Sequence, residues 1–276
     1  MADSYRICLI VPPGYRHASC FLEVAVLLKA SLAALGYDCD MKVNELAKDR
    51  VNVVLGYHLM EPGTHLREYR YIPYQLEQLT AAEYRFTDKQ RAVLETAERV
   101  WEYSTENVAF LAAQGIAARH LPLGHHPALE RIPMARERDI DVVFYGSQGE
   151  RRRTVLEALS RAGLKVQVLF GAYGDKRDGV VGRAKIVLNI HYYSSRIFEA
   201  VRVSYLLNNR CFVVSEDSPV NPYPGVDLAL APYDRLVETC RRYAADPARC
   251  IETGERTAEQ FRRLYPMTDL VRSVLA

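Results

Sequence analysis

The sequence has little excess charge of either sign and no long apolar run. Its 276 residues carry 36 Lys and Arg against 34 Asp and Glu, a net charge of +2. Without a global field, neither nucleic acid nor an anionic membrane is an implied partner, although arginine pairs can form local patches. The apolar run in the N-terminal MADSYRICLIVPPG is too short for a signal peptide, and we find nothing near the roughly 18 apolar residues of a transmembrane helix. We therefore expect a soluble, cytoplasmic protein without a transmembrane segment.

Motifs for metal binding and redox chemistry are also missing. The six cysteines are scattered without CxxC spacing, and Cys8 and Cys211 lie in strand-like runs, where cysteine acts as a small apolar residue. The adjacent His125 and His126 lack acidic partners nearby in a pattern such as HExxH. GxGxxG follows neither opening strand, which disfavours a dinucleotide oxidoreductase. We expect reduced thiols, no metal ion and no cofactor besides a co-substrate.

What the chain does contain is a regular alternation of strand-like and helical runs, with 49% hydrophobic residues to form a core. The first half predicts strands at Arg6–Val11, Asp38–Lys42, Val51–Leu55 and Tyr71–Gln75, with helices at Cys20–Leu35 and Thr105–Gln114. The second half predicts strands at Ile140–Tyr145, Val166–Phe170, Ile186–Asn189 and Cys211–Ser215, with helices at Glu150–Arg161, Lys176–Arg183 and Phe198–Asn208. Such alternation is typical of α/β architecture with parallel sheets.

The segment Pro122–Asp139 interrupts this alternation with prolines and charges and has no periodicity. It indicates an interdomain linker. We expect an N-terminal domain over 1–124, a linker over 125–139 and a C-terminal domain over 140–265. A last helix over 266–276 follows a proline that stops the preceding helix, and it could turn back across the first domain.

The most informative segment is Ile186–Ser215, IVLNIHYYSSRIFEAVRVSYLLNNRCFVVS. It predicts a βαβ unit whose helix opens at Phe198-Glu199. Ligands of open α/β sheets bind beyond the carboxyl ends of the strands, where helix N-termini attract phosphate. A carboxylate at this place accepts hydrogen bonds from ribose hydroxyls, while Arg196 would face a diphosphate. The pattern indicates a sugar-nucleotide site, and the alternative is a Glu199 that only stabilises the helix dipole.

A second candidate is the turn Gly146-Ser147-Gln148-Gly149, which is followed by Arg151, Arg152 and Arg153. The glycines let the backbone approach a ligand, and the helix that begins near Glu150 offers free N–H groups. Cations are unfavourable at a helix N-terminus unless an anion is present. The pattern therefore favours a phosphate site over a merely solvated face.

Three segments carry a resemblance to a known family: DVVFYGSQGERR, then LNIH, then RIFEAVRVSYLLNNRCFVVSE. In this order, Asp141–Glu216 resembles the nucleotide-binding C-terminal domain of GT-B glycosyltransferases of the group-1 type. The resemblance implies two Rossmann-like α/β domains facing a cleft, with the donor in the second domain and the acceptor in the first. It also implies that Arg152, or second Arg151, neutralises the donor diphosphate and that Glu199 binds the ribose.

Further donor-site candidates follow the other strands of this half. His191 stands eight residues before Glu199, where many retaining GT-B enzymes carry a glutamate, and it would contact the sugar or diphosphate, or be satisfied by the backbone. Asn189 would order the loop, and Tyr173 would stack on the base or lie in a plain turn. Glu216, just past the last strand, would contact sugar hydroxyls or, more simply, be a surface charge.

Two residues of the first half are candidate bases toward an acceptor hydroxyl. His17 follows the first strand and Glu77 the fourth, and an imidazole with a pKa of about 6.5 suits proton transfer. Each is otherwise a structural or substrate-positioning residue.

We therefore expect a metal-independent glycosyltransferase that moves a sugar from a nucleoside diphosphate sugar to an acceptor hydroxyl. The acceptor is open among a glycan, a lipid-linked sugar, a metabolite, a protein and a modified nucleobase. The alternatives are a sugar-nucleotide 2-epimerase on the same scaffold and a non-catalytic sugar-nucleotide-binding protein.

Overall fold

The chain folds into two compact α/β units. The computed structural model describes residues 3–60 and 66–276, apart from the side chain of Arg16. Unit 1 comprises Met1–Ala128 together with Tyr265–Ala276, and unit 2 comprises Leu129–Leu264. The sequence pattern places the corresponding linker over 125–139 and the last helix from residue 266.

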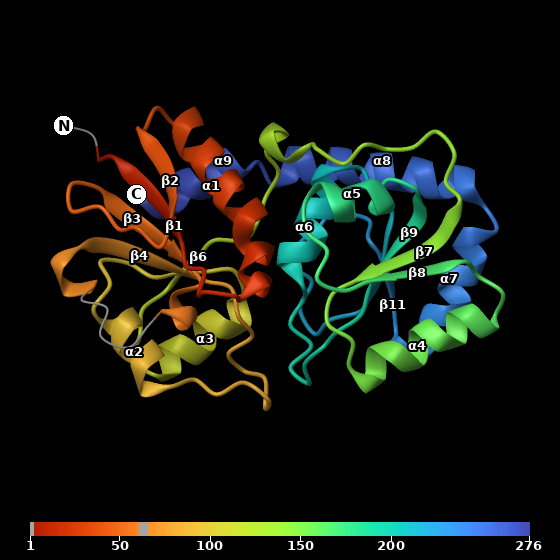
Figure 1. The fold of residues 1–276 in the computed structure, drawn as a ribbon, viewed down its shortest axis with the longest axis horizontal. Coiled ribbons are helices and arrows are strands. Elements are labelled where there is room, and N and C mark those ends of the chain that lie inside the picture. The colour runs from red at the N-terminus through yellow and green to blue at the C-terminus, as the bar shows by residue number, and fades with distance from the viewer. Residues whose placement is uncertain (1–2, 61–65) are drawn as a thin grey trace. The chain divides into compact units, whose positions relative to one another are not determined.

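Unit 1 is built on a six-stranded parallel sheet in the order β2-β1-β3-β4-β5-β6 (Figure 1). The strands are β1 (Tyr5–Leu9), β2 (Cys39–Val43), β3 (Val51–Leu55), β4 (Arg70–Gln75), β5 (Trp101–Glu102) and β6 (Arg119–His120). Every residue of the central strand β3 is buried, as expected for the apolar run VNVVL in a sheet that is covered on both faces. The strand order reverses direction between β1 and β3, so a crevice is expected beyond their carboxyl ends.

Helices cover both faces of this sheet. Helices α1 (Leu22–Ala34) and α9 (Met267–Leu275) pack together on one face, and α2 (Asp88–Glu95) and α3 (Thr105–Ala113) cover the other (Figure 1). The returning α9 is tied to the sheet by Arg119, whose Nη1 donates to the Val274 carbonyl at 2.7 Å. Helix α3 begins where the sequence predicts, because the Ser104 hydroxyl caps it by accepting from the Asn107 N–H.

One stretch differs from the expectation about membrane spans. His17–Ala34 is helical and, by length and composition alone, apolar enough to cross a membrane, and half of it is buried inside the structure. Its helix α1 packs against α9, the edge strand β2 and the neighbouring strand β1. It thus has the surroundings of a core helix in a folded unit.

Unit 2 contains a five-stranded parallel sheet in the order β11-β10-β9-β7-β8. Its strands are β7 (Ile140–Tyr145), β8 (Val166–Leu169), β9 (Ala184–Asn189), β10 (Val213–Glu216) and β11 (Ala229–Ala231). Helices α4 (Glu150–Arg161) and α7 (Leu236–Ala244) cover one face, and α5 (Asp175–Val181), α6 (Ala200–Asn208) and α8 (Pro247–Leu264) cover the other (Figure 1). The strand order reverses between β7 and β9. That position defines where a ligand is expected.

Candidate functional site

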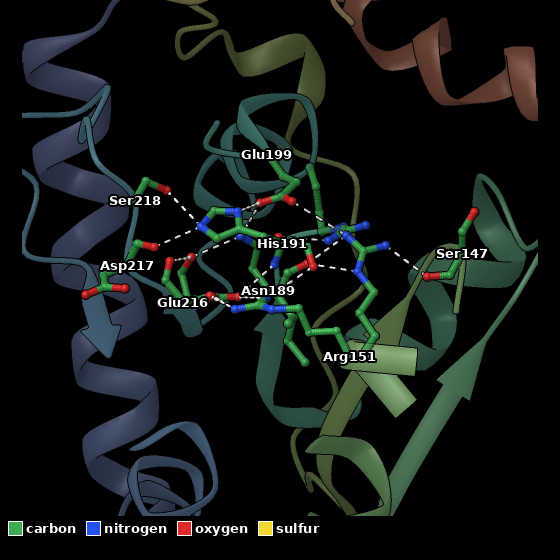
Figure 2. Close-up of polar contacts among 12 residues, drawn as sticks. Ser147, Arg151, Asn189, His191, Glu199, Glu216, Asp217 and Ser218 are labelled. Atoms are coloured by element: carbon green, nitrogen blue, oxygen red, sulfur yellow. Dashed lines mark hydrogen bonds and ion pairs between the residues drawn. The ribbon is translucent and has the colours of Figure 1, made fainter. Parts of the chain in front are cut away.

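A network of charged and amide side chains lies at the carboxyl ends of β7, β9 and β10 in unit 2 (Figure 2). This is the side of the sheet, and the point of strand reversal, where open α/β folds bind ligands. We call it the polar network, and its members are Arg151, Arg152, Asn189, His191, Glu199, Arg202 and Glu216. All of them are site residues predicted from the sequence except Arg202, which stands three residues after Glu199.

Glu199 turns its side chain away from the helix that it precedes. It is the N-cap of α6, yet its carboxylate accepts no hydrogen bond from the N–H groups of that helix. Instead Oε2 accepts from His191 Nδ1 at 2.9 Å and from Asn189 Nδ2 at 3.0 Å. Direct capping of the helix therefore does not explain Glu199, whose side chain joins the ends of β9 and α6.

His191 is held by acceptors at both ring nitrogens. Nδ1 faces the Glu199 carboxylate, and Nε2 lies 2.8 Å from the Asp217 carbonyl oxygen and 3.1 Å from the Ser218 hydroxyl (Figure 2). A carbonyl and a carboxylate can only accept, so both nitrogens must carry protons for both bonds to form. Burial alone lowers the pKa of His191, but the bond to Glu199 and its charge outweigh burial and raise that pKa. His191 is a buried imidazolium.

The same ion pair keeps Glu199 charged. Burial on its own raises the pKa of Glu199, but the hydrogen bond and charge of His191, with the charges of Arg202 and Arg152, hold it below its usual value. The other oxygen, Oε1, is buried, accepts no hydrogen bond from any described residue and lies 3.5 Å from Arg152 Nη2. Glu199 is therefore an ionised carboxylate with one oxygen that still has capacity to accept.

Arg152 is buried beneath the turn that precedes α4. Its Nε and Nη2 donate to the Ile190 carbonyl at 2.9 and 2.6 Å, and Nη1 donates to the Ser147 carbonyl at 2.9 Å. The guanidinium lies over the rings of Phe144 and Tyr192. Burial and the neighbouring charge of Arg202 lower the pKa of Arg152 to about 9. Arg152 stays a cation at neutral pH and fixes the turn against the end of β9.

The position of Arg202 accounts for the glycine that follows β7, Gly146. The Nη1 of Arg202 donates to Asn189 Oδ1 at 2.8 Å, while its Nε is buried without a hydrogen-bond partner among the described residues. A Cβ atom added to Gly146 would lie 2.7 Å from Arg202 Nη2, and Gly146 has φ of +129°. Only glycine fits this conformation beside the guanidinium. The signal in the sequence was the spacing of Arg202, three residues after Glu199 and thus on the same face of α6.

Glu216 is not the surface charge that the sequence suggested. It is the last residue of β10, only 1% of its side chain is exposed, and it forms a two-fold ion pair with Arg151. Its Oε2 also accepts from the His191 N–H at 3.1 Å. Arg151 in turn lies over the Tyr233 ring, 4.0 Å from its centroid. Both oxygens of Glu216 are engaged, so this pair is part of the framework.

The remaining predicted donor residues lie around the network. Ser147 is exposed and contributes its carbonyl to Arg152, and Tyr173 is half-buried in the loop between β8 and α5. Arg196 is exposed and has φ of +52°, and in the described part of the chain its side chain forms no hydrogen bond or ion pair with the network. The expectation that Arg196 faces the diphosphate stays a prediction.

The charges of the network do not cancel. Its two carboxylates face four cations, namely Arg151, Arg152, Arg202 and the protonated His191. The first turn of α4 adds N–H groups and the positive end of a helix dipole beside them. An excess of two positive charges at a helix N-terminus is complementary to a doubly charged anion.

The two base candidates lie in unit 1. Glu77 follows β4, 24% of its side chain is exposed, and its Oε1 lies 3.5 Å from His58 Nε2. Burial raises the pKa of Glu77 and lowers that of His58 to about 4, so His58 is a neutral imidazole. No motif marks His58 in the sequence, so it could not be selected there. His17 is exposed in the turn Arg16–Phe21, with its ring edge-on to Tyr15 at 5.6 Å between centroids.

Acidic residues with the DxD spacing lie elsewhere. Asp139 and Asp141 flank the start of β7, at the edge opposite the polar network, and pair with Arg183 and Lys185. Within residues 3–60 and 66–276, no group of three His, Cys, Asp or Glu side chains is arranged to hold a metal ion.

Comparisons by sequence find relatives that carry no assigned activity. No protein-family model matches the chain. Uncharacterized protein L137 of Acanthamoeba polyphaga mimivirus is 30% identical over 148 residues, which is 51% of this chain and 20% of that protein. Uncharacterized protein L140 of the same virus is 24% identical over 155 residues, 52% of this chain and 50% of that protein. The chain thus spans half or less of the length of these relatives.

Solved structures superpose on nearly the whole chain. AviGT4, a glycosyltransferase involved in avilamycin A biosynthesis, covers 99% of it and is itself covered to 96%, with a TM-score of 0.62 and 13% identity. The DNA-modifying enzyme β-glucosyltransferase covers 99% and is covered to 98%, with a TM-score of 0.62 and 11% identity. TarM of S. aureus covers 92% and is covered to 58%, with a TM-score of 0.60 and 10% identity. The chain has the GT-B glycosyltransferase fold.

The predicted fold class, α/β with two Rossmann-like domains, is therefore confirmed. In this GT-B fold the polar network belongs to the second Rossmann-like unit, and Glu77, His58 and His17 belong to the first. At identities of 10 to 13% the comparison shows the fold alone.

The protonated His191 makes a testable contribution to stability. Because folding raises the pKa of His191, its stabilisation is complete below a pH of about 6.5, the pKa of an unfolded histidine, and is lost as pH rises through the folded value. We expect His191→Gln to lower the free energy of unfolding by about 1–3 kcal/mol at pH 5.5 and by less at pH 9. Urea unfolding of both proteins at the two pH values measures this, and an equal loss at both would contradict an imidazolium.

Proposed function

We propose that this protein transfers a sugar from a nucleoside diphosphate sugar to an acceptor hydroxyl, with the donor bound by unit 2. The observation that carries the proposal is the excess of two positive charges beside the N-terminus of α4, at the strand reversal of a Rossmann-like sheet. A diphosphate carries a matching negative charge. UDP is bound in the TarM structure and UDP-glucose is the substrate named for β-glucosyltransferase, which supports a nucleotide-sugar donor.

Two parts of the donor, the diphosphate and the ribose, have counterparts at this site. We assign the diphosphate to the N–H groups of the first turn of α4, with Arg152 and Arg202 as the nearby cations. We assign a ribose hydroxyl to Glu199, whose Oε1 accepts no hydrogen bond among the described residues; this oxygen is buried here, so donor binding would have to expose it. His191 then acts on Glu199 rather than on the donor, because both of its nitrogens are engaged.

This arrangement supports a metal-independent mechanism. As the bond between sugar and diphosphate breaks, negative charge builds up on the leaving diphosphate while the sugar becomes cationic. Prearranged guanidinium groups and a helix N-terminus stabilise that charge without reorganising, which lowers the barrier. In unit 1, Glu77 would accept the proton of the acceptor hydroxyl, since a carboxylate with a raised pKa is the stronger base.

The net charge of unit 1 indicates which class of acceptor it can bind. Residues 1–128 and 265–276 carry 14 Lys and Arg against 16 Asp and Glu. A polyanion such as DNA gains most of its affinity from neutralised phosphates, and a net negative unit does not supply this. We therefore propose an uncharged hydroxyl acceptor, such as a glycan or a small metabolite, rather than a nucleobase within nucleic acid.

Two neighbouring arginines give a matched test of donor turnover. Arg152 is buried in the network, whereas Arg153 is exposed on α4. With UDP-, GDP-, ADP- and dTDP-sugars, and simple glycosides and water as acceptors, we expect phosphorus and proton NMR to show release of the nucleoside diphosphate. Arg152→Lys should slow it about tenfold or more, because lysine cannot reproduce the fork of bonds to Ile190 and Ser147, while Arg153→Lys should not.

Other outcomes of the same incubation decide against transfer. Conversion of the donor to an epimer would make the protein a 2-epimerase. Donor binding without any turnover would make it a sugar-nucleotide-binding protein. Equal turnover by the two arginine variants would remove Arg152 from the diphosphate site.

The role of Glu199 is tested by removing hydroxyls from the ligand. If Glu199 binds the ribose, a nucleoside diphosphate should bind more tightly than its 2′,3′-dideoxy analogue, by about 1.5–3 kcal/mol for hydrogen bonds to a charged group. Glu199→Gln should shrink this difference, because an amide is the weaker acceptor. Titration calorimetry on both proteins measures it. An undiminished difference in the variant would place the ribose elsewhere.

A further inference from the structure

A chain of buried polar side chains runs beneath Glu77 at the carboxyl ends of β4 and β5 in unit 1. Gln75 is the last residue of β4, Glu102 is the last residue of β5, and Asn107 lies in the first turn of α3. None of the three has any exposed surface. Buried polar side chains need hydrogen-bond partners, so the partners of these three residues indicate which parts of the chain they keep in place.

Two of these side chains hold the backbone of Glu77. Gln75 brackets the residue, because its Nε2 donates to the Glu77 carbonyl at 2.6 Å and its Oε1 accepts from the Glu77 N–H at 3.2 Å. Asn107 Nδ2 donates to the same carbonyl at 2.7 Å, and Asn107 Oδ1 accepts from the Leu79 N–H at 3.0 Å. The segment that carries Glu77 is thus bound to the body of the unit, while part of its side chain stays exposed.

Glu102 orients the second of these amides. Its Oε1 accepts from Asn107 Nδ2 at 3.1 Å and from the Ser104 N–H at 3.0 Å. With one Nδ2 hydrogen directed to Glu102 and the other to Glu77, and with Oδ1 bound to Leu79, the Asn107 amide has all its strong bonding capacity in use. Without Glu102 one of its donors would be left unpaired in the core.

The carboxyl of Glu102 is costly to bury. Its Oε2 has no hydrogen-bond partner among the described residues, and no cation pairs with it there. Burial raises the pKa of Glu102 well above its usual range, which favours the uncharged acid. An apolar side chain in the same place would avoid this desolvation cost, which indicates a role other than stability.

We propose that Glu102 is a positioning residue for Glu77: it orients Asn107, which fixes the backbone of Glu77 and so holds the Glu77 carboxylate where it meets the acceptor hydroxyl. The inference rests on the proposed function, in which Glu77 takes the acceptor's proton. A base must lie within hydrogen-bond reach of the proton it removes, and a misplacement of about 1 Å costs up to about 100-fold in rate. A buried frame of amides is suited to prevent such a displacement.

The test compares Glu102→Gln, which keeps an uncharged side chain with an acceptor oxygen, with Glu102→Leu, which removes that acceptor. Ile7→Val, a core change in β1 of the same unit, controls for general loss of stability. Carbon NMR of protein labelled at the glutamate carboxyl carbons follows the titration of Glu77. The signal of Glu77 is identified by its loss in the Glu77→Gln variant. We expect the raised pKa of Glu77 to persist in Glu102→Gln and Ile7→Val and to fall in Glu102→Leu, as the carboxylate moves into water. The same titration in all four proteins would overturn the positioning role.

Kinetics of nucleoside diphosphate release separate this inference from the proposed function. We expect Glu102→Leu to lower kcat about 10- to 100-fold with KM for the donor unchanged, and Glu102→Gln to restore it. Unchanged kcat in Glu102→Leu would overturn the inference and leave donor binding by unit 2 intact. A wild-type protein that binds no nucleotide sugar would overturn the proposed function, and the Glu77 titration would still decide whether Glu102 positions Glu77.

Discussion

The ion pair between His191 and Glu199 is the interaction on which the rest of unit 2's site depends. It joins the end of β9 to the start of α6 at 2.9 Å, and through the other ring nitrogen it reaches the loop after β10. A buried pair of this kind gains little net stability, because the desolvation of both charges offsets their attraction. Its value lies in geometry. Three segments that are distant in sequence are held in one arrangement before any ligand arrives.

The cations follow from that arrangement. Asn189, which donates to Glu199, also accepts from Arg202, and Glu216 pairs with Arg151. Arg152 donates to the Ile190 carbonyl next to His191 and lies 3.5 Å from Glu199. The network thus holds two carboxylates and four cations, two of which, Arg151 and Arg152, lie in the first turn of α4. Charges that are fixed in advance stabilise a leaving diphosphate without a reorganisation cost, which is the requirement for charge stabilisation without a metal ion.

Much of this was predictable from sequence, because the signals were local. The bounds of α4 and β3 agree with the sequence to the residue, since a glycine precedes the helix and an unbroken apolar run forms the strand. The burial of Glu216 was missed because it depends on Arg151, which is 65 residues away. Arg202 and Glu102 were passed over for a similar reason. From the sequence alone, a single charged residue in an apolar run does not indicate which residue of another helix or strand it will pair with.

The proposed function depends on the recognition of a diphosphate by unit 2. The direct measurement is titration calorimetry at fixed ionic strength with a nucleoside, its monophosphate and its diphosphate, in the uridine, guanosine, adenosine and thymidine series. We expect that, in the series that binds, affinity rises with each added phosphate, by about tenfold or more at the second. A tenfold rise corresponds to about 1.4 kcal/mol, which is reasonable for one added charge-assisted contact. Equal affinity for nucleoside and diphosphate, or no binding in any series, would contradict the proposed function.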